Sequence, residues 1–272
     1  MSKLKGKKVL ITGGASGIGL LMGRMALAKG AAELCIWDIN PEAMALEANK
    51  LKEKGYAVIT RRVDVSDNSA ISEAANALMA ESWVPDILIL NAGIVSGKFF
   101  HEHVPDEIQK TISVNISGVM LVAHAFLPAM IKRGSGHLVT IASAAGMLSN
   151  PRMAVYAGSK WAVLGWSESV RLEMEQLRTG IRVTTVTPSY IDTGMFDGVS
   201  TNFVIPRVKP EVAARKIICG IERNKIFVRM PFMVYTIPFV KGILPVRWFD
   251  VLVGKGIGVY NTMSTFTGRK NM

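Results

Sequence analysis

A tyrosine and a lysine stand four residues apart in the segment YAGSK, at Tyr156 and Lys160. In a helix, residues i and i+4 share one face, so the phenol and the ammonium would lie side by side. Such a pair can exchange a proton with a ligand, because a neighbouring positive charge favours the phenolate and lowers the pKa of the tyrosine. Taken alone, the pair is more typical of a surface tyrosine beside a solvated lysine. The residues between them are small, which would leave room for a cofactor to approach.

A glycine-rich turn, TGGASGIG at residues 12–19, lies between a short apolar run and an amphipathic stretch. Glycine after a strand allows a tight turn close to a pyrophosphate, and the N–H groups at the following helix start attract its negative charge. The spacing T-G-x-x-x-G-x-G uses Gly13, Gly17 and Gly19 and differs from the more usual G-x-G-x-x-G. The turn and its context together predict a nucleotide site.

Asp38 ends the second apolar run, 19 residues after Gly19. An acidic side chain there accepts hydrogen bonds from both hydroxyls of an adenosine ribose. A 2′-phosphate would meet like charge at Asp38, and Ser16 stands where a basic residue would be expected to hold that phosphate. The sequence therefore predicts NAD in preference to NADP. The alternative is that Asp38 caps the next helix, but Asn40, directly before Pro41, is the better cap candidate.

Short β-branched runs alternate with amphipathic stretches of helical length over residues 1–190. This alternation predicts a doubly wound α/β fold, a three-layer Rossmann-type parallel sheet of about seven strands with helices on both faces. The predicted strands cover residues 8–12, 33–38, 57–65, 86–90, 136–143, 181–188 and 226–229, and the predicted helices cover 17–29, 41–54, 67–82, 106–132, 154–178 and 210–223. We expect one NAD-binding and catalytic domain at residues 1–229 and a C-terminal extension at residues 230–272.

Residues 111–131 contain no Asp, Glu, Lys or Arg and are numerous enough to cross a bilayer as a helix. Asn115, His124 and Pro128 argue against a membrane span. A long helix packed between the sheet and a neighbouring subunit has the same composition, and we expect this second arrangement.

Six further motifs accompany the glycine turn. They are DVSD at residues 64–67, NAG at 91–93, SVN at 113–115, IASAAG at 141–146, YAGSK at 156–160 and PSYIDT at 188–193. In this order and spacing the chain resembles the main subgroup of the short-chain dehydrogenase/reductase family over residues 7–193. The departures are small, since Leu90 stands where the family often has asparagine and Ser189 replaces a glycine in the turn under the nicotinamide.

The resemblance implies a nicotinamide dinucleotide cofactor. In the family, the counterpart of Asp64 faces the adenine amino group and the counterpart of Thr193 reaches the nicotinamide carboxamide. The full set implied for cofactor binding is Thr12, Gly13, Ser16, Gly17, Ile18, Gly19, Asp38, Asp64, Val65, Asn91, Ala92, Gly93, Tyr156, Lys160, Pro188, Ile191 and Thr193. We expect no metal, because the spacing of the four histidines is not that of metal ligands.

The resemblance also implies an oxidoreductase that moves a hydride between NAD(H) and an alcohol or ketone, with Tyr156 as general acid/base. Lys160 would lower the pKa of that phenol and bind the nicotinamide ribose. Ser143 would hydrogen-bond the substrate oxygen and stabilise a forming alkoxide. Asn115 would position a water that connects the lysine to solvent. Taken singly, Ser143 could merely end a strand and Asn115 could satisfy a helix kink.

Residues 226–260 are strongly apolar, rich in Phe, Met, Val and Ile, and carry four basic residues. Their longest uncharged piece, residues 230–240, holds two prolines and is too short to span a bilayer. One interpretation is a substrate lid or subunit interface packed on the core. A second is an interfacial contact with an anionic membrane. A nucleic-acid surface is not expected, because aliphatic side chains rather than base-stacking platforms accompany the cations.

The extension loosely resembles that of the branch containing retinol dehydrogenases and 17β-hydroxysteroid dehydrogenases, which act on apolar alcohols. We therefore expect a lipophilic secondary alcohol or ketone: a sterol, a retinoid-like molecule or a long-chain hydroxy compound. A reductase of 3-oxoacyl thioesters would use the same residues, but such enzymes more often favour NADP, which Asp38 opposes. A non-catalytic scaffold would be recognised by a missing catalytic residue, and none is missing.

The chain has a formal charge of +11, and residues 201–272 carry 12 Lys and Arg against 3 Asp and Glu. Cys35 and Cys219 lie in apolar segments, which is typical of reduced core thiols, and the N-terminus lacks the apolar stretch of a signal peptide. We expect a cytoplasmic protein that can attach to the periphery of a membrane. The resemblance implies a homodimer or homotetramer formed through the helices at 106–132 and 154–178.

Overall fold

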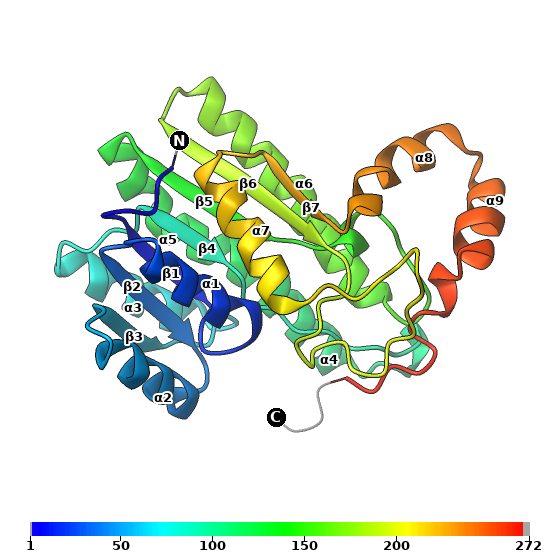
Figure 1. Ribbon diagram of the computed structural model, residues 1–272, viewed down its shortest axis with the longest axis horizontal. Coiled ribbons are helices and arrows are strands. Elements are labelled where there is room, and N and C mark those ends of the chain that lie inside the picture. The colour runs from blue at the N-terminus through cyan, green and yellow to red at the C-terminus, as the bar shows by residue number, and fades with distance from the viewer. Residues whose placement is uncertain (1, 269–272) are drawn as a thin grey trace.

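The computed structural model describes residues 2–268, and a single parallel sheet forms its centre (Figure 1). The strands are β1 (Lys8–Thr12), β2 (Glu33–Asp38), β3 (Val58–Arg62), β4 (Ile87–Leu90), β5 (Gly136–Ile141), β6 (Ile181–Pro188) and β7 (Phe227–Met230). Neighbouring strands run parallel in the order β3-β2-β1-β4-β5-β6-β7. The predicted seven-stranded, doubly wound sheet is confirmed, and the segment near residue 226 supplies its seventh strand.

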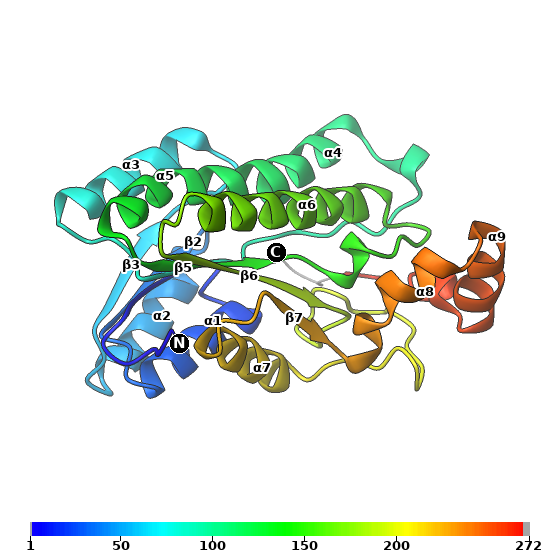
Figure 2. The ribbon, with the colours of Figure 1, turned by 90° about the horizontal axis from the view of Figure 1, so that it is seen from above.

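Helices cover both faces of the sheet, as the strand-helix alternation predicted. They are α1 (Gly17–Ala28), α2 (Pro41–Lys52), α3 (Asn68–Ala80), α4 (Pro105–Ile112), α5 (Gly118–Arg133), α6 (Ala154–Gln176) and α7 (Pro210–Glu222), followed by the short α8 (Ile237–Ile243) and α9 (Val246–Phe249). Figure 2 shows α1, α2 and α7 on one side of the sheet and α3 to α6 on the other. The molecule therefore has the three layers of a Rossmann-type fold.

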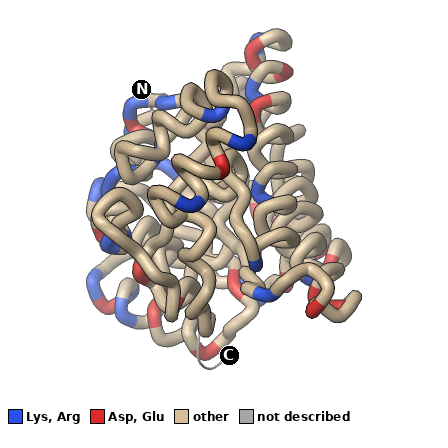
Figure 3. Tube along the Cα trace, turned by 90° about the vertical axis from the view of Figure 1, so that its right-hand side faces the viewer, with Lys and Arg blue, Asp and Glu red and all other residues tan. Residues whose placement is uncertain are grey.

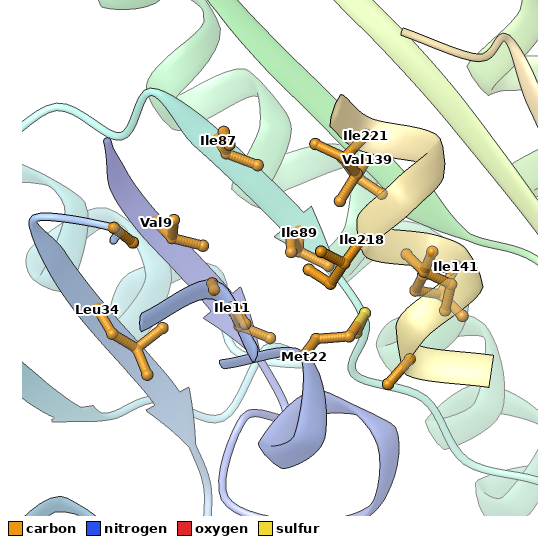
Figure 4. Packing of buried hydrophobic residues seen from close by; sticks show 14 of the residues in the cluster. Val9, Ile11, Met22, Leu34, Ile87, Ile89, Val139, Ile141, Ile218 and Ile221 are labelled. Atoms are coloured by element: carbon orange, nitrogen blue, oxygen red, sulfur yellow. The ribbon is translucent and has the colours of Figure 1, made fainter. Parts of the chain in front are cut away.

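Two apolar cores hold these layers together, one on each face of the sheet. Figure 4 shows the first, in which Met22 of α1 and Ile218 and Ile221 of α7 face strand residues such as Ile11 and Ile89. In the second, Trp37 of β2 and Phe126 of α5 place their ring centroids 5.6 Å apart. Strands buried on both faces need apolar side chains in both directions, which explains runs such as ILIL in β4.

The apolar stretch predicted as one helix at 106–132 is interrupted. A π-helical turn, Ser113–Ser117, separates α4 from α5. Together Pro105–Arg133 have the length and hydropathy of a membrane-spanning helix. However, α5 buries Val122, Phe126 and Met130 in the core beneath the sheet, so packing accounts for its composition.

The start of α2 follows the predicted capping. The side chain of Asn40 accepts a hydrogen bond from the Ala43 N–H at 2.9 Å, and Pro41 occupies the first turn. This arrangement satisfies one of the unpaired N–H groups at the helix start. Asp38, two residues earlier, is therefore not the cap of α2.

The chain after β7 leaves the sheet and forms α8, α9 and a π-helical turn, Asp250–Gly256. Figures 1 and 2 show α8 and α9 projecting beyond the end of the sheet, on the side of β7 and α6. Because this end of the sheet holds the carboxyl ends of the strands, the projecting segment lies at the edge where the sequence motifs converge.

Candidate active site

The sequence motifs lie where parallel strands end. Gly13 directly follows β1, Asn91 follows β4, Ser143 lies two residues past β5 and Ser189 follows β6. The strand order reverses at β1, between β2 and β4, and in sheets of this kind such a point opens a crevice outside the carboxyl ends.

The glycine turn is shaped by close backbone approaches. Gly13 and Gly17 have φ angles of +64° and +54°, which L side chains rarely adopt. A Cβ on Gly19 would stand 2.2 Å from the Gly13 carbonyl oxygen, so only glycine fits there. The Asn91 amide donates to the carbonyls of Thr12 and Gly13, each at 3.0 Å. The NAG motif thus fixes the glycine turn from the neighbouring strand.

Asp38 lies beside this turn. Its carboxylate accepts hydrogen bonds from the Ala15 N–H at 3.0 Å and from the Asn40 N–H at 3.1 Å. Each carboxylate oxygen has a further lone pair, so the half-buried side chain can still accept hydrogen bonds from a ligand. The aspartate is therefore held in place by the turn whose nucleotide it was predicted to recognise.

Asp64 is held by neighbours of its own. It accepts hydrogen bonds from the Ser66 N–H and hydroxyl, at 2.9 and 2.6 Å, and from Lys110 Nζ at 3.1 Å. Desolvation opposes ionisation of this carboxylate, but the bonds from Ser66 and Lys110 outweigh it and hold the pKa of Asp64 below its usual value. Asp64 is therefore ionised at neutral pH.

Asn115 and Lys160 approach a common point beside Gly93. Asn115 is fully buried in the π-helical turn, where its side chain bonds both the N–H and the carbonyl of Ile94 at 2.9 Å. A Cβ on Gly93 would lie 3.3 Å from Asn115 Oδ1 and 3.5 Å from Lys160 Nζ. Lys160 Nζ also donates to the Ile141 carbonyl at 3.0 Å. The structure thus brings together two residues 45 positions apart in the sequence.

Tyr156 and Ser143 are both buried at this point, with 5% and 8% of their surfaces exposed. The Ser143 hydroxyl accepts from the Ala145 N–H at 3.1 Å and donates to the Pro188 carbonyl at 3.4 Å. Lys160 Nζ lies 5.7 Å from the centroid of the Tyr156 ring. The phenol therefore lies close to both the hydroxyl of Ser143 and the ammonium of Lys160.

The expected fall in the pKa of Tyr156 is wrong for the protein's own groups. Burial raises the pKa of Tyr156 to about 12, and the Ser143 hydroxyl offsets this only in part. Burial also lowers the pKa of Lys160 to about 8, because the ammonium is desolvated. The charge of the lysine is evident from the sequence, whereas the cost of removing both groups from water depends on tertiary burial.

The small residues of YAGSK do not make room for a cofactor, so that expectation is also wrong. Gly158 is exposed, and a Cβ there would meet nothing within 4 Å. Ala157 packs in a small core cluster, and the Ser159 hydroxyl donates to the Tyr156 carbonyl at 2.7 Å and accepts from Asn115 at 3.0 Å. The Ser159 hydroxyl thus connects α6 to the π-helical turn, and Ala157 packs within the protein.

A cavity in the crevice is lined by most of the predicted cofactor residues. Its lining includes Gly13, Ser16, Gly17, Ile18, Asn91, Ala92, Gly93, Ser143, Tyr156, Lys160, Pro188, Ile191 and Thr193. The predicted residues Thr12, Gly19, Asp38, Asp64, Val65 and Asn115 are not among its lining residues, and Val65 packs in the core. Sequence reasoning missed Ile141, Ala142, Met195 and Phe196 and did not count Ser189 among the cofactor residues. The position of Met195 and Phe196, two and three residues after Thr193, was the available signal.

A second cavity, of about 180 Å³, shares Ser143, Ser189 and Phe196 with the first. No Asp, Glu, Lys, Arg or His is among its lining residues within 2–268. The segment after β7 contributes much of the wall, including Val234, Ile237, Val240, Phe249, Val253 and Ile257. No residue pattern in the sequence indicated this wall, because the wall depends on how the extension folds back over the strand ends.

Polar atoms in the second cavity are concentrated in a small cluster. The Tyr190 hydroxyl lies 2.8 Å from Thr262 Oγ1, and Asn150 Nδ2 donates to that same oxygen at 3.0 Å. Phe196 packs edge-on against the rings of Tyr156 and Tyr190, with centroid distances of 5.9 and 5.3 Å. The aromatic rings therefore form a continuous wall from the phenol of Tyr156 toward the C-terminal segment.

The sequence profile of the family described as short chain dehydrogenase matches residues 7–202. The chain belongs to this family. Among its curated relatives, epidermal retinol dehydrogenase 2 of Mus musculus is 38% identical over 97% of this chain and 86% of the mouse protein. Estradiol 17-beta-dehydrogenase 11 of Homo sapiens is 35% identical over 92% of this chain and 83% of the human protein.

Solved structures have the same fold. A short chain dehydrogenase/reductase from Burkholderia phymatum in complex with NAD superimposes with a TM-score of 0.80 at 23% identity, covering 93% of this chain and 97% of the other. A gluconate 5-dehydrogenase from Burkholderia cenocepacia J2315, in complex with NADP and tartrate, gives 0.77 at 25% identity over 86% and 98%. This protein is accordingly a nicotinamide dinucleotide-dependent oxidoreductase acting on CH–OH groups, as the motifs predicted.

Proposed function

We propose that the enzyme transfers a hydride between NAD(H) and a lipophilic secondary alcohol or ketone. The observation that carries this proposal is the second cavity, whose uncharged wall meets the nucleotide cavity at Ser143 and Phe196. Binding in an apolar cavity is favoured by a free energy of about 25 cal/mol for each Å² of apolar substrate surface that is removed from water. The names of the relatives, a retinol and an estradiol dehydrogenase, support the same substrate class.

The crevice fits a nicotinamide dinucleotide. The glycine turn leaves no room for side chains at Gly19, and it opens α1, whose first N–H groups suit a pyrophosphate. The carboxylate of Asp38 has lone pairs left for ribose hydroxyls and would repel a 2′-phosphate, which favours NAD. Thr193 also lines the cavity, and there it would hold the nicotinamide carboxamide. When bound, the oxidised cofactor accepts the hydride from the alcohol carbon.

Tyr156 would handle the proton. With its pKa raised to about 12, the phenol is protonated at neutral pH and suited to donate to a ketone oxygen during reduction. In the oxidation direction Tyr156 must first lose that proton, and the ammonium of Lys160 would stabilise the phenolate. Ser143 would hold the substrate oxygen as charge forms on it. Asn115, fixed beside Gly93 and close to Lys160, would hold a water leading from the lysine to solvent.

Two further proposals concern the chain as a whole. We assign NAD binding and catalysis to residues 1–229, and to residues 230–272 a substrate lid, because their side chains form much of the apolar wall. A homodimer or homotetramer would bury the exposed Trp161 and Leu172 of α6. A cytoplasmic location with peripheral membrane attachment suits the substrate class, since apolar alcohols partition into bilayers.

The main rival is reduction of 3-oxoacyl thioesters, for which the same four polar residues would serve. Coenzyme A and acyl carriers bear phosphates, and among the residues that the structure describes the lining of the second cavity offers no cation to pair with them. A scaffold without catalysis is less consistent with the site, because phenol, ammonium, hydroxyl and amide are all present and buried together.

A substrate panel tests the proposal. We expect kcat/KM with NAD to rise by about threefold to fourfold for each CH2 added along a series of secondary alcohols. This factor corresponds to the free energy of about 0.8 kcal/mol gained when one CH2 leaves water. Polyols and 3-oxoacyl thioesters serve as controls and should be poor substrates. Chain-length independence, or preference for the thioesters, would contradict the assignment.

A further inference from the structure

The helices after β7 present a large apolar face to solvent. We call this surface the outer face. Its side chains are each 50% to 76% exposed, and they belong to Phe239, Ile243, Val246, Trp248, Val251 and Leu252. Soluble monomers seldom expose a contiguous apolar patch of this size unless it contacts a partner or a membrane. Figures 1 and 2 show α8 and α9 extending from the body of the enzyme, which leaves this face accessible to a large partner.

The same segment is apolar on its inner side. The second cavity, called the substrate cavity from here on, is lined by four residues of this segment: Ile237, Val240, Phe249 and Val253. These residues alternate along the chain with members of the outer face. Lys241 Nζ attaches α8 to the body by donating to the Met147 carbonyl at 3.0 Å. A thin apolar layer therefore separates the substrate cavity from the outside of the molecule. Contact of this layer with an apolar environment would remove its exposed side chains from water.

The charges on this segment favour an anionic surface. The side chain of Arg247 is 95% exposed and lies 3.8 Å from the carboxylate of Asp250, the one acidic residue among residues 230–260. That carboxylate also accepts a hydrogen bond from the Tyr260 hydroxyl at 2.5 Å, whereas Lys255 is exposed and has no acidic neighbour within residues 251–259. Figure 3 looks onto this end of the molecule and shows mostly uncharged chain with scattered basic and acidic residues. A second copy of the chain would bring Arg247 and Lys255 toward like charges. Anionic lipid headgroups would instead attract them, by about 1 kcal/mol for each cation near the surface.

We propose that the outer face docks in the interfacial layer of an anionic membrane and that the substrate cavity receives its alcohol from that layer. Aromatic and aliphatic side chains of α8 and α9 enter the acyl boundary, and Arg247 and Lys255 meet the headgroups. A lipophilic substrate then reaches Ser143 and Tyr156 without crossing water. The delivery of substrate from the membrane rests on the proposed function, whereas the docking depends only on the outer face.

The test compares two double variants of the full chain. Phe239→Ser with Trp248→Ser removes two large members of the outer face, and neither residue lines the cavity. Leu46→Ser with Leu177→Ser changes an exposed leucine of α2 and one directly after α6, which are 60% and 68% exposed, and serves as the matched control. Flotation with vesicles of phosphatidylcholine and phosphatidylserine measures docking, and light scattering measures oligomer size. Turnover of a short, water-soluble secondary alcohol without vesicles reports on the active site alone.

We expect the wild-type enzyme and the control to float with the vesicles, more strongly at low salt than at high salt. The outer-face variant should partition at least about tenfold less, keep its oligomer size and keep its turnover of the soluble alcohol. Its KM for a vesicle-borne alcohol should rise while kcat stays unchanged. The docking proposal is overturned if the wild type fails to float at low salt, if both variants float equally, or if the outer-face variant changes oligomer size. If flotation follows the outer face but no apolar alcohol is oxidised, the proposed function fails while the docking stands.

Discussion

At the scale of single residues, burial sets the proton chemistry of the site. Tyr156 and Lys160 are each about 95% buried, and desolvation moves the pKa of the phenol up to about 12 and that of the ammonium down to about 8. Both changes favour the neutral forms of the side chains. The pair is therefore adjusted for proton donation at neutral pH, and forming the phenolate needs positive charge near the ring.

The raised pKa of Tyr156 leads to a prediction on pH. Alcohol oxidation needs the phenolate, whose fraction rises about tenfold per pH unit below the pKa, so log kcat/KM should rise with a slope near one between about pH 6 and 8. Ketone reduction needs the protonated phenol and should not rise over this range. Steady-state kinetics in both directions measure this, and equal pH profiles in the two directions would be inconsistent with Tyr156 as the acid/base.

The carboxylate of Asp38 leads to a prediction on cofactor choice. Asp38→Ala removes the charge that would repel a 2′-phosphate and the acceptor for the ribose hydroxyls. We expect kcat/KM with NADP to rise and that with NAD to fall, each by about tenfold, which corresponds to about 1.4 kcal/mol. Kinetics with both cofactors measure the ratio. An unchanged ratio would show that Asp38 does not face the ribose.

At the scale of elements, the strand ends and the turns between elements position the site. All seven strands and the six predicted helical segments, which correspond to α1 through α7, could be predicted because hydrophobic periodicity and the glycine turn are local signals. The π-helical turn at Asn115 could not, since its cause includes hydrogen bonds to Ile94, which lies 21 residues earlier. The open side of Gly158 was missed for a similar reason, because its orientation depends on how α6 packs.

The glycine turn leads to a prediction at this scale. Gly19→Ala places a methyl group 2.2 Å from the Gly13 carbonyl, so the turn must shift. We expect the Kd for NADH, measured by fluorescence titration, to rise at least about tenfold. Gly165→Ala in α6 is the matched control, because its added methyl meets nothing within 4 Å. Equal NADH affinity in the two variants would mean that the turn does not hold the cofactor.

At the scale of the whole molecule, the segment after β7 completes the substrate cavity. The sequence indicated that residues 226–260 were apolar and basic, and it left a lid, a subunit interface and a membrane contact open. The structure shows that Ile237 and Phe249 line the same cavity as Ser143 and Tyr190, and no pattern in the chain identified this shared cavity in advance. Cavities formed by distant segments depend on tertiary packing, and periodicity does not report it.

The solvent-exposed side of α6 leads to a prediction about assembly. Leu172 is 55% exposed on a helix that lacks a covering layer within the described chain. Leu172→Arg should weaken a dimer or tetramer formed there, because a buried unpaired charge costs several kcal/mol. Light scattering should then detect a smaller species, whereas Leu46→Arg on α2, where Leu46 is 60% exposed, should leave the size unchanged. A wild-type monomer, or equal sizes in all three proteins, would argue against this interface.

Kinetics and cofactor binding of Tyr156→Phe test the central claim most directly, since phenylalanine keeps the ring and removes only the hydroxyl. With NAD and the best apolar alcohol of the panel, we expect kcat to fall by about 10³-fold or more, while the Kd for NADH stays within about twofold of the wild-type value. A variant that keeps wild-type turnover would show that Tyr156 does not transfer the proton, and the account of this site would then be wrong.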